Sequence, residues 1–269
     1  MDNSVNQLKK KFILTIDQGT TSSKAILFNI NGKSVFKSKI EFKQYFPKNG
    51  WVEHNPEEIW KKTKKVLINA ISKNKRLKGD ILCIGITNQR ETTILWDRTT
   101  GKPVYNAIVW QDRRTSDFCK KYKSSKSERL INRKTGLLID PYFSGTKIKW
   151  IIENIPKAKK LLKKKQLLFG TIDTFLIWRL TKGKVHATDA TNASRTMLYN
   201  ITTNKWDEQI LKSLKIPFHI LPEIKNSSDN FGKTHQAITG KSYKITGVVG
   251  DQQAATIGQC CFQKGSVKS

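Results

Sequence analysis

The sequence predicts an α/β fold built on a mixed sheet, with an antiparallel meander at its start and flanking helices. Three features carry this prediction: an opening series of short apolar strands, a helix with a clear N-terminal signal after them, and later strands that alternate with helical segments. The chain contains no internal repeat and no low-complexity linker. Its 269 residues are enough to bury a substantial core without disulfide or metal staples.

The opening strands are predicted to form the meander. Phe12–Asp17 is a short apolar run that ends in a carboxylate, and Lys24–Ile30 is a second run. Asn31-Gly32 is a strong signal for a two-residue hairpin turn, and the alternation over Lys33–Phe42 predicts a third strand. Residues 1–11 are expected to be a basic N-terminal extension.

A helix is predicted after Asn55, because this N-cap residue and a first-turn proline precede apolar positions that keep helical spacing as far as Ala70. Ile81–Thr87 is apolar and rich in β-formers, and we expect Thr92–Trp96 to be its hairpin partner. A short strand is expected at Ala107–Trp110.

The second half of the chain is predicted to be mainly helical from residue 115 to about residue 164, apart from a loop over residues 135–145. Further strands are expected at Leu167–Gly170 and Lys244–Val249. Further helices are expected at Asp173–Leu180, Trp206–Leu214 and Asp251–Cys260.

The composition excludes several classes of protein. No apolar run reaches the length of a membrane span, and the N-terminus lacks an apolar signal core, so we expect a cytoplasmic protein without membrane insertion. The cysteines show neither a CxxC pair nor metal-ligand spacing with a histidine, which fits a reducing compartment; they are Cys83, Cys119, Cys260 and Cys261.

The formal charge of +29 would ordinarily suggest a nucleic-acid partner. Lysine, however, outnumbers arginine by 41 to 9, and the lysines are dispersed along the chain. Proteins that read bases and phosphates usually depend on arginine, whose planar guanidinium forks onto these groups. We therefore expect solvated lysine rather than a specific nucleic-acid surface.

Arg90 and Glu91 are the most informative pair of residues. In the stretch Gly85–Thr93, an apolar strand leads directly into these two opposite charges, and such a pair is typical of a polar site. A guanidinium donates up to five hydrogen bonds and a carboxylate accepts several, so the pair can hold the hydroxyls of a small polyol. The alternative is a surface ion pair, which would contribute little.

Asp17-Gln-Gly-Thr-Thr21 has the parts of a phosphate loop, because its glycine permits a tight turn and its hydroxyls and amides can face anionic oxygens. It is not a Walker motif, since the Gly-Lys-Ser/Thr ending is missing. A carboxylate at a strand end, here Asp17, can hold hydrated Mg²⁺. The alternative is an ordinary hairpin turn.

Asp251 follows an apolar strand and stands at a predicted helix N-terminus, where a base can be oriented; an N-cap aspartate is the alternative. Tyr142, in the turn Asp140–Thr146, can offer a hydroxyl to a substrate or simply pack. The histidines show no partner pattern and are assigned no role; they are His54, His186, His219 and His235.

Together with four further segments, these residues resemble the glycerol kinases of the FGGY carbohydrate kinase family over nearly the whole chain, from Phe12 to Lys268. The further segments are Pro47–His54, Thr100–Trp110, Leu168–Thr174 and Thr188–Met197. The resemblance implies the two-domain, actin-like ATPase (ribonuclease H-like) fold, with the active site in the cleft between domains. It implies an enzyme that transfers the γ-phosphate of ATP to glycerol to give sn-glycerol 3-phosphate.

The resemblance also implies roles for individual residues. It places six side chains on the hydroxyls and carbon face of glycerol: Arg90, Glu91, Trp110, Tyr142, Asp251 and Gln252. Asp251 is implied as the general base that takes the proton of the attacking hydroxyl. Asp17 is implied near Mg²⁺, and the residues implied near the nucleotide phosphates are Thr20, Thr21, Ser22 and Lys24.

Two departures from the family pattern modify these expectations. Lys24 stands where bacterial relatives commonly have an arginine, so a forked phosphate contact becomes a point charge and weaker nucleotide binding is expected. Residues 235–243 lack the glycine-rich loop through which some relatives bind fructose 1,6-bisphosphate, so this regulation is not expected.

The resemblance implies that residues 12–255 correspond to the N-terminal kinase domain and residues 256–269 to the start of a second domain, into which family members continue. We therefore expect the chain to carry the glycerol side and the base but little of the ATP site, to bind glycerol weakly and to turn over ATP negligibly. Family members form homo-oligomers. The sequence does not determine the oligomeric state of this chain. The alternatives are an inactive truncated remnant and another FGGY sugar kinase.

Overall fold

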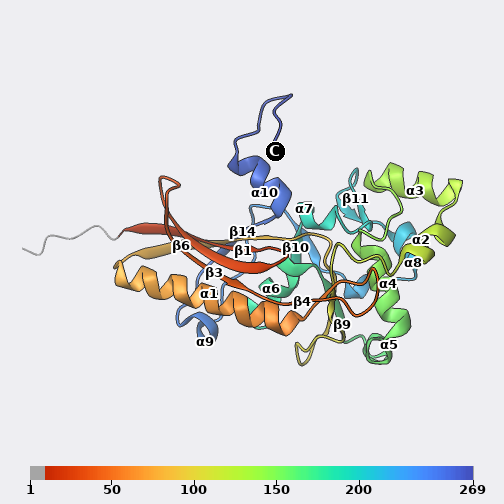
Figure 1. The fold of residues 1–269 in the computed structure, drawn as a ribbon, viewed down its shortest axis with the longest axis horizontal. Helices are drawn as coiled ribbons and strands as arrows, with labels where there is room; N and C mark the ends of the chain where they lie inside the picture. Colours follow the sequence, from red (N-terminus) through yellow and green to blue (C-terminus); the bar gives the residue numbers. More distant parts are fainter. Residues whose placement is uncertain (1–9, 269) are drawn as a thin grey trace, which may run out of the picture.

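The computed structural model describes residues 10–268 and contains a mixed sheet of five strands in the order β14-β6-β1-β2-β3 (Figure 1). The first three strands form the antiparallel meander, while β6 and β14 run parallel to β1. Their bounds are β1 (Lys11–Gln18), β2 (Ser22–Asn29), β3 (Ser34–Glu41), β6 (Asp80–Asn88) and β14 (Ile245–Gly250). The predicted α/β fold with an opening meander is confirmed. The expected N-terminal extension lies outside the described residues apart from Lys10 and Lys11, and β1 already begins at Lys11.

Helix α1 (Pro56–Arg76) covers the meander and begins where the sequence predicts. The Asn55 side chain accepts hydrogen bonds from the backbone N–H groups of Glu57 (2.9 Å) and Glu58 (3.3 Å), which satisfies two donors of the first turn. The apolar face of α1 and helix α6 (Ile172–Leu180) share one buried core with the sheet; its members include Leu14, Ile16, Ile59, Leu67, Ile84 and Phe175.

Strand β7 (Ile94–Asp97) corrects one expectation, because it does not form a hairpin with β6. It pairs antiparallel with β9 (Leu167–Gly170), Ile94 opposite Gly170. The physical reason is that β6 already has a parallel neighbour on each edge, β1 and β14, so no free edge remains for a hairpin partner. The left-handed backbone of Glu91 (φ 58°) turns the chain away from the sheet instead.

The β7–β9 pair supports a second buried core with the helices of the right side of Figure 1. Members of this core include Leu95, Ile131, Ile148, Leu161, Phe169 and Ile210. The helices that surround it are α2 (Ser116–Tyr122), α3 (Ser125–Thr135), α4 (Ser144–Asn154), α5 (Pro156–Lys163) and α8 (Glu208–Leu214). Helix α8 starts two residues later than predicted, because Asp207 is its N-cap and accepts from the N–H of Ile210 at 3.0 Å.

Short elements complete the fold. A three-stranded sheet is formed by β4 (Gln44–Tyr45), β5 (Glu53–His54) and β8 (Ala107–Ile108), and two-stranded sheets by β10 (Ala187–Asp189) with β13 (Glu223–Lys225) and by β11 (Tyr199–Asn200) with β12 (Lys205–Trp206). The remaining helices are α7 (Ala190–Ala193), the 3-10 turn Phe218–Ile220, α9 (Gln236–Thr239) and α10 (Asp251–Gly258). Across residues 10–268, no helix combines the length and apolarity needed to cross a membrane.

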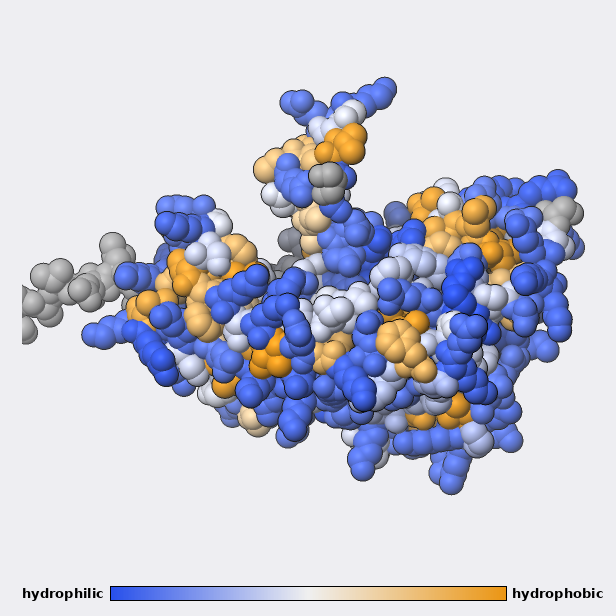
Figure 2. All heavy atoms as spheres, in the orientation of Figure 1, coloured by the Kyte–Doolittle hydropathy of each residue, from blue (hydrophilic) through white to orange (hydrophobic). Residues whose placement is uncertain are grey.

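The C-terminal segment projects from the rest of the molecule. Helix α10 buries none of its residues, and the described chain after it also extends away from the body (Figures 1 and 2). Ile257, Phe262 and Val267 in this segment are 56%, 71% and 85% exposed, so three apolar side chains face solvent here.

Asp173 in α6 is a fully buried carboxyl group that makes the stability of the fold depend on pH. The hydroxyls of Thr171 (2.5 Å) and Thr188 (2.6 Å) donate to it. Burial, reinforced by the carboxylate of Asp189, raises the pKa of Asp173 to about 7 from an ordinary value of 3.8. The protonated carboxyl therefore stabilises the fold fully below about pH 4, and this contribution is lost as the pH rises through 7.

The variant Asp173→Asn removes this ionisation. Between about pH 5 and pH 8, the free energy of unfolding of the parent chain should fall relative to the variant by on the order of 2 kcal/mol. Urea unfolding at both pH values measures this difference. The contributions of the other titrating groups to the free energy of unfolding cancel, because both chains contain those groups. The control Asp117→Asn, on an exposed side chain of α2, should leave the pH dependence unchanged. Parallel pH profiles for the parent and Asp173→Asn would contradict the prediction.

Candidate functional site

The candidate site lies where the parallel strands β1, β6 and β14 end. The register places Gln18 of β1 and Gly250 of β14 on either side of Asn88 of β6, so all three strands end at the same edge of the sheet. In open α/β sheets, the carboxyl ends of parallel strands are where polar segments converge on ligands. The segments that follow these strands here are Gly19–Thr21, Gln89–Glu91 and the start of α10.

Glu91 is the most buried acidic group of this site, with only 1% of the residue exposed. Its carboxylate accepts a hydrogen bond of 2.6 Å from Nε of Arg195. Burial raises the pKa of Glu91, while the charges of Arg195, Arg90 and Lys147 oppose that rise. A buried carboxylate with a guanidinium on one oxygen keeps acceptor capacity for a ligand hydroxyl on the other.

Arg90 is paired with residues of α10 rather than with Glu91. Its Nε donates to Oδ1 of Asp251 at 3.1 Å and its Nη1 donates to Oε1 of Gln253 at 3.3 Å, which ties the end of β6 to α10. Arg90 and Glu91 are therefore not partners of each other in an exposed ion pair. Each is paired to a residue distant in sequence, and the surface-pair alternative is wrong.

Asp251 is the first residue of α10, and its N-cap is Gly250, so the alternative of a capping aspartate is also wrong. Its Oδ1 accepts from Arg90 and from the backbone N–H of Gln252 (2.8 Å). The side chain remains 41% exposed, which leaves this carboxylate accessible from the open side of the site. Gln252 is exposed, and its side-chain oxygen accepts from Lys268, so the structure does not bring it to Glu91.

Trp110 and Tyr142 form an aromatic wall beside Glu91. Their ring centroids lie 5.7 Å apart at 67°, and the guanidinium of Arg195 lies 5.4 Å from the Tyr142 ring. Trp110 Nε1 donates to the hydroxyl of Thr20 at 3.0 Å, which connects the wall to the turn after β1. Burial, followed by the charge of Glu91, raises the pKa of Tyr142, so its hydroxyl stays a neutral donor.

The turn after β1 presents only some of its predicted phosphate ligands. Gly19 N–H donates to the carbonyl of Ser22 at 3.0 Å and closes the turn, Thr21 is exposed, and Ser22 is buried at the start of β2. Lys24 lies opposite Asp17 in the β1–β2 ladder and pairs with it at 2.8 Å.

Asp17 fits a limited metal role. Both Asp17 and Lys24 are more than a quarter exposed, so their pair can open towards a ligand. Among residues 10–268, no cluster of three or more His, Cys, Asp or Glu side chains could hold a metal ion. Mg²⁺ commonly uses only one or two carboxylates and completes its shell with waters and substrate phosphates. One partly exposed carboxylate beside a phosphate-type turn suits that arrangement.

Two residues of the site were not singled out from the sequence. Arg195 lies in the segment Thr188–Met197, but no local pattern identifies its partner, which is 104 positions away. Lys147 is completely buried and donates to the carbonyl oxygens of Tyr142 (2.6 Å) and Glu91 (3.4 Å). Its burial lowers its pKa to about 7. The sequence of α4 gives no local signal that the side chain of Lys147 points inward.

Comparison with known proteins identifies close relatives. A model of the N-terminal domain of the FGGY family of carbohydrate kinases matches residues 12–258. A glycerol kinase of Petrotoga mobilis is 56% identical over 260 residues, and one of Rhizobium meliloti is 55% identical over 258 residues. The crystal structure of Plasmodium falciparum glycerol kinase with ADP superposes with a TM-score of 0.92 at 40% identity, covering 96% of this chain.

The chain spans about half the length of each of these relatives. The matches cover 97% and 96% of this chain but 52% of both the Petrotoga and the Rhizobium proteins. The same holds for the Plasmodium structure, of which 52% is covered.

Proposed function

Because the chain belongs to the FGGY family of carbohydrate kinases, we propose that it forms the polyol-binding half of a glycerol kinase, which transfers the γ-phosphate of ATP to a terminal hydroxyl of glycerol. The observation that carries this proposal is the convergence of Glu91, Arg90 and Asp251 at the ends of the neighbouring parallel strands β6 and β14. The half that the relatives have in addition would supply the remainder of the ATP site.

Glycerol would lie between the aromatic wall and the charged pairs. The Glu91 carboxylate and the Arg90 guanidinium would bind its hydroxyls, and Trp110 would contact its carbon face. Tyr142 would donate its hydroxyl. A polyol has no net charge, so a site with alternating paired donors and acceptors binds it better than a site of one charge sign.

Asp251 would act as the general base. Its carboxylate is held by Arg90 at 3.1 Å but is accessible, so it could take the proton of a terminal hydroxyl as that oxygen attacks the γ-phosphorus. The proton would move to the carboxylate and the bond from the γ-phosphorus to the β,γ-bridging oxygen would break, which releases ADP. Positioning and neutralisation of charge supply most of the catalysis in such transfers.

The turn after β1 would face the nucleotide. Thr20, Thr21 and Lys24 would lie near the phosphates, and Asp17 would hold the hydration shell of Mg²⁺, which neutralises phosphate charge when bound. Ser22 would contribute through its backbone, because the residue is buried. Residues 12–255 would then be the first domain of the kinase, and residues 256–269, with their exposed apolar side chains, would lead into the second.

Glycerol binding to this chain tests the proposal. Glu91→Gln keeps the shape of the side chain but removes its charge, so the affinity for glycerol should fall roughly tenfold to a hundredfold. Titration calorimetry at millimolar glycerol measures this. Glu208→Gln, an exposed residue of α8, is the matched control and should bind like the parent. Equal affinity of Glu91→Gln and the parent for glycerol would contradict the proposed glycerol site. Tighter binding of xylulose or gluconate than of glycerol would favour another sugar kinase.

A further inference from the structure

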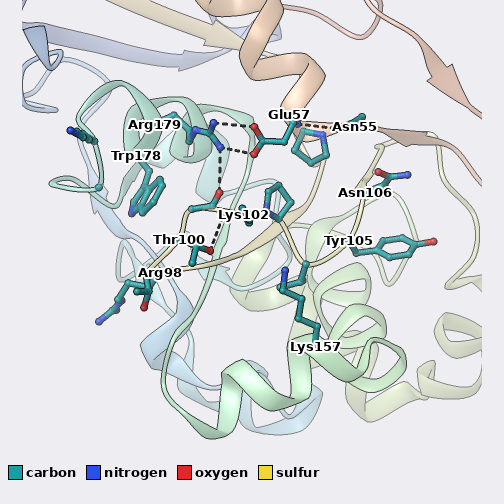
Figure 3. A pocket seen from close by; sticks show the side chains of 17 residues that line it. Asn55, Glu57, Arg98, Thr100, Lys102, Tyr105, Asn106, Lys157, Trp178 and Arg179 are labelled. Atoms are coloured by element: carbon teal, nitrogen blue, oxygen red, sulfur yellow. Dashed lines mark hydrogen bonds and ion pairs between the residues drawn. The ribbon is translucent and has the colours of Figure 1, made fainter. Parts of the chain in front are cut away.

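A cleft of about 1130 Å³ lies between the start of α1, the end of α6 and the turn over residues 98–106 (Figure 3), and none of its lining residues belongs to the candidate site. Strand β7 separates the two places: it starts three residues after Glu91 and ends at Asp97, next to Arg98 of the cleft. At roughly 3.3 Å per residue, this puts at least about 10 Å of strand between them. The walls come from the start of α1, the turn over residues 98–106, the start of α5 and the end of α6.

The cleft is lined by cations. Four of them form no ion pair with a carboxylate within residues 10–268, and all four are exposed: Arg98, Lys102, Lys157 and Lys182. A fifth, Arg179, donates from Nη1 and Nη2 to the two carboxylate oxygens of Glu57, at 2.6 and 3.0 Å. Glu57 is the one acidic residue among those that line the cleft, and its pair with Arg179 neutralises it. The charge of Lys157 also acts on the nearby carboxylate of Asp97, whose pKa it helps to lower, so Asp97 offsets part of the positive charge. Arg98, Lys102 and Lys182 still leave the cleft positive.

The frame of the cleft is fixed by hydrogen bonds. Asp97 accepts from the backbone N–H of Thr99 (2.8 Å) and from the hydroxyl of Thr100 (2.9 Å), which holds the turn in shape. Arg179 also donates to the carbonyl of Gly101 (3.3 Å), so the turn is tied to α6 and α1 together. Figure 3 shows Arg179 paired with Glu57 on one side of the cleft and Lys157 of α5 on the other. The cations thus surround a preformed space.

The aromatic side chains of the lining, Trp178 and Tyr105, already pack against other parts of the chain. Gly101 and Gly183 lie directly against the Trp178 ring: a Cβ at Gly101 would lie 2.6 Å from it and one at Gly183 would lie 3.2 Å from it. Both glycines have left-handed backbones, so other residues would be strained there as well. Tyr105 packs on Trp150, and its hydroxyl donates to Glu53 at 2.6 Å. These contacts limit the ring surface on which a nucleobase could stack, which favours a ligand without a base.

We propose that this cleft binds a small molecule with several phosphate groups and no base. Lysine ammonium groups act as mobile point charges that suit phosphate oxygens, and the cleft presents three of them with Arg98 around one space. A volume of about 1130 Å³ exceeds a single phosphate and is near the upper range of small-molecule sites. Its lining is a concave set of turns and helix ends, which fits a compact polyanion better than an extended peptide.

The experiment is titration calorimetry of inorganic tripolyphosphate into the chain at physiological salt. Replacing Lys102, Lys157 and Lys182 together by Gln should weaken binding roughly tenfold to a hundredfold, because each ion pair of an exposed lysine contributes modestly and three are lost. The matched control replaces Lys61, Lys64 and Lys65, on the exposed side of α1, by Gln and removes the same charge. It should change the affinity less than about twofold.

Equal weakening by both triple variants would overturn the proposal, because binding would then follow the overall charge of +29 alone. Tighter binding of a poly-glutamate peptide than of tripolyphosphate would overturn it in favour of a protein partner. Lys24→Gln separates this cleft from the turn after β1: retained binding supports the cleft, and lost binding contradicts it. Glu91→Gln should bind tripolyphosphate like the parent, so failure of the glycerol proposal and failure of this one are distinguishable.

Discussion

Asp251→Asn is expected to lower kcat for glycerol phosphorylation about a hundredfold to ten-thousandfold, the usual contribution of a general base. The measurement requires a complete cleft, so residues 1–269 are joined to the second half of the Petrotoga mobilis relative, with which this chain shares 56% identity. Coupled release of ADP in the presence of glycerol reports the rate. The KM for glycerol should change much less, because Asn keeps the shape and the oxygen that accepts from Arg90.

The control for this prediction is Asp80→Asn at the opposite end of β6, where the carboxylate is about half exposed and pairs with Lys241. It should leave kcat unchanged. If Asp251→Asn retained more than about a tenth of the parent kcat, positioning alone would account for the rate and Asp251 would not be the base. Residues 1–269 without the second half are expected to release ADP negligibly with glycerol, and release well above that of their own Asp251→Asn variant would contradict this.

The parts of the fold that the sequence predicts well are those with local signals. Asn31-Gly32 predicts a hairpin between β2 and β3, and Asn55 with Pro56 predicts the start of α1; both elements are confirmed. The predicted two-residue turn was wrong: Asn29 N–H donates to the carbonyl of Lys33, so three residues form the loop, and only Gly32 among them has a positive φ. The prediction that β7 pairs with β6 was wrong, because strand pairing depends on contacts between residues far apart in the sequence. Only the assembled sheet reveals that both edges of β6 are occupied, by strands that lie far apart in the sequence.

The candidate site shows the same limit at the level of single side chains. Arg90 and Glu91 stand out because opposite charges follow an apolar strand, and the structure places both near the ends of the parallel strands. Their actual partners, Asp251 and Arg195, are 161 and 104 positions away. The sequence does not reveal Lys147 for a related reason. Among residues 10–268, Lys147 is the one buried lysine, and nothing local distinguishes it from the dispersed lysines that reach solvent.

Arg114→Met is expected to lower the free energy of unfolding by about 3–5 kcal/mol, since it leaves buried charges without a partner. The Arg114 side chain is inaccessible to solvent and donates to Glu53 (2.7 Å) and to Asp112 (2.8 and 2.9 Å). Its guanidinium also lies 3.8 Å from the centroid of the Trp51 ring. Methionine fills a similar volume but pairs with neither carboxylate.

The adjacent Arg113 is the matched control, because its side chain is 53% exposed and its pair with Asp140 is open to water. Arg113→Met should cost less than about 1 kcal/mol. Urea unfolding of both variants measures the contrast, and similar midpoints would mean that the Arg114 network contributes no more than a surface pair.

The Arg114 network also supports the candidate site. Asp112 accepts from the backbone N–H of Val52 at 2.6 Å and lies two residues after Trp110. Loss of Arg114 should therefore loosen the aromatic wall and weaken glycerol binding in molecules that remain folded.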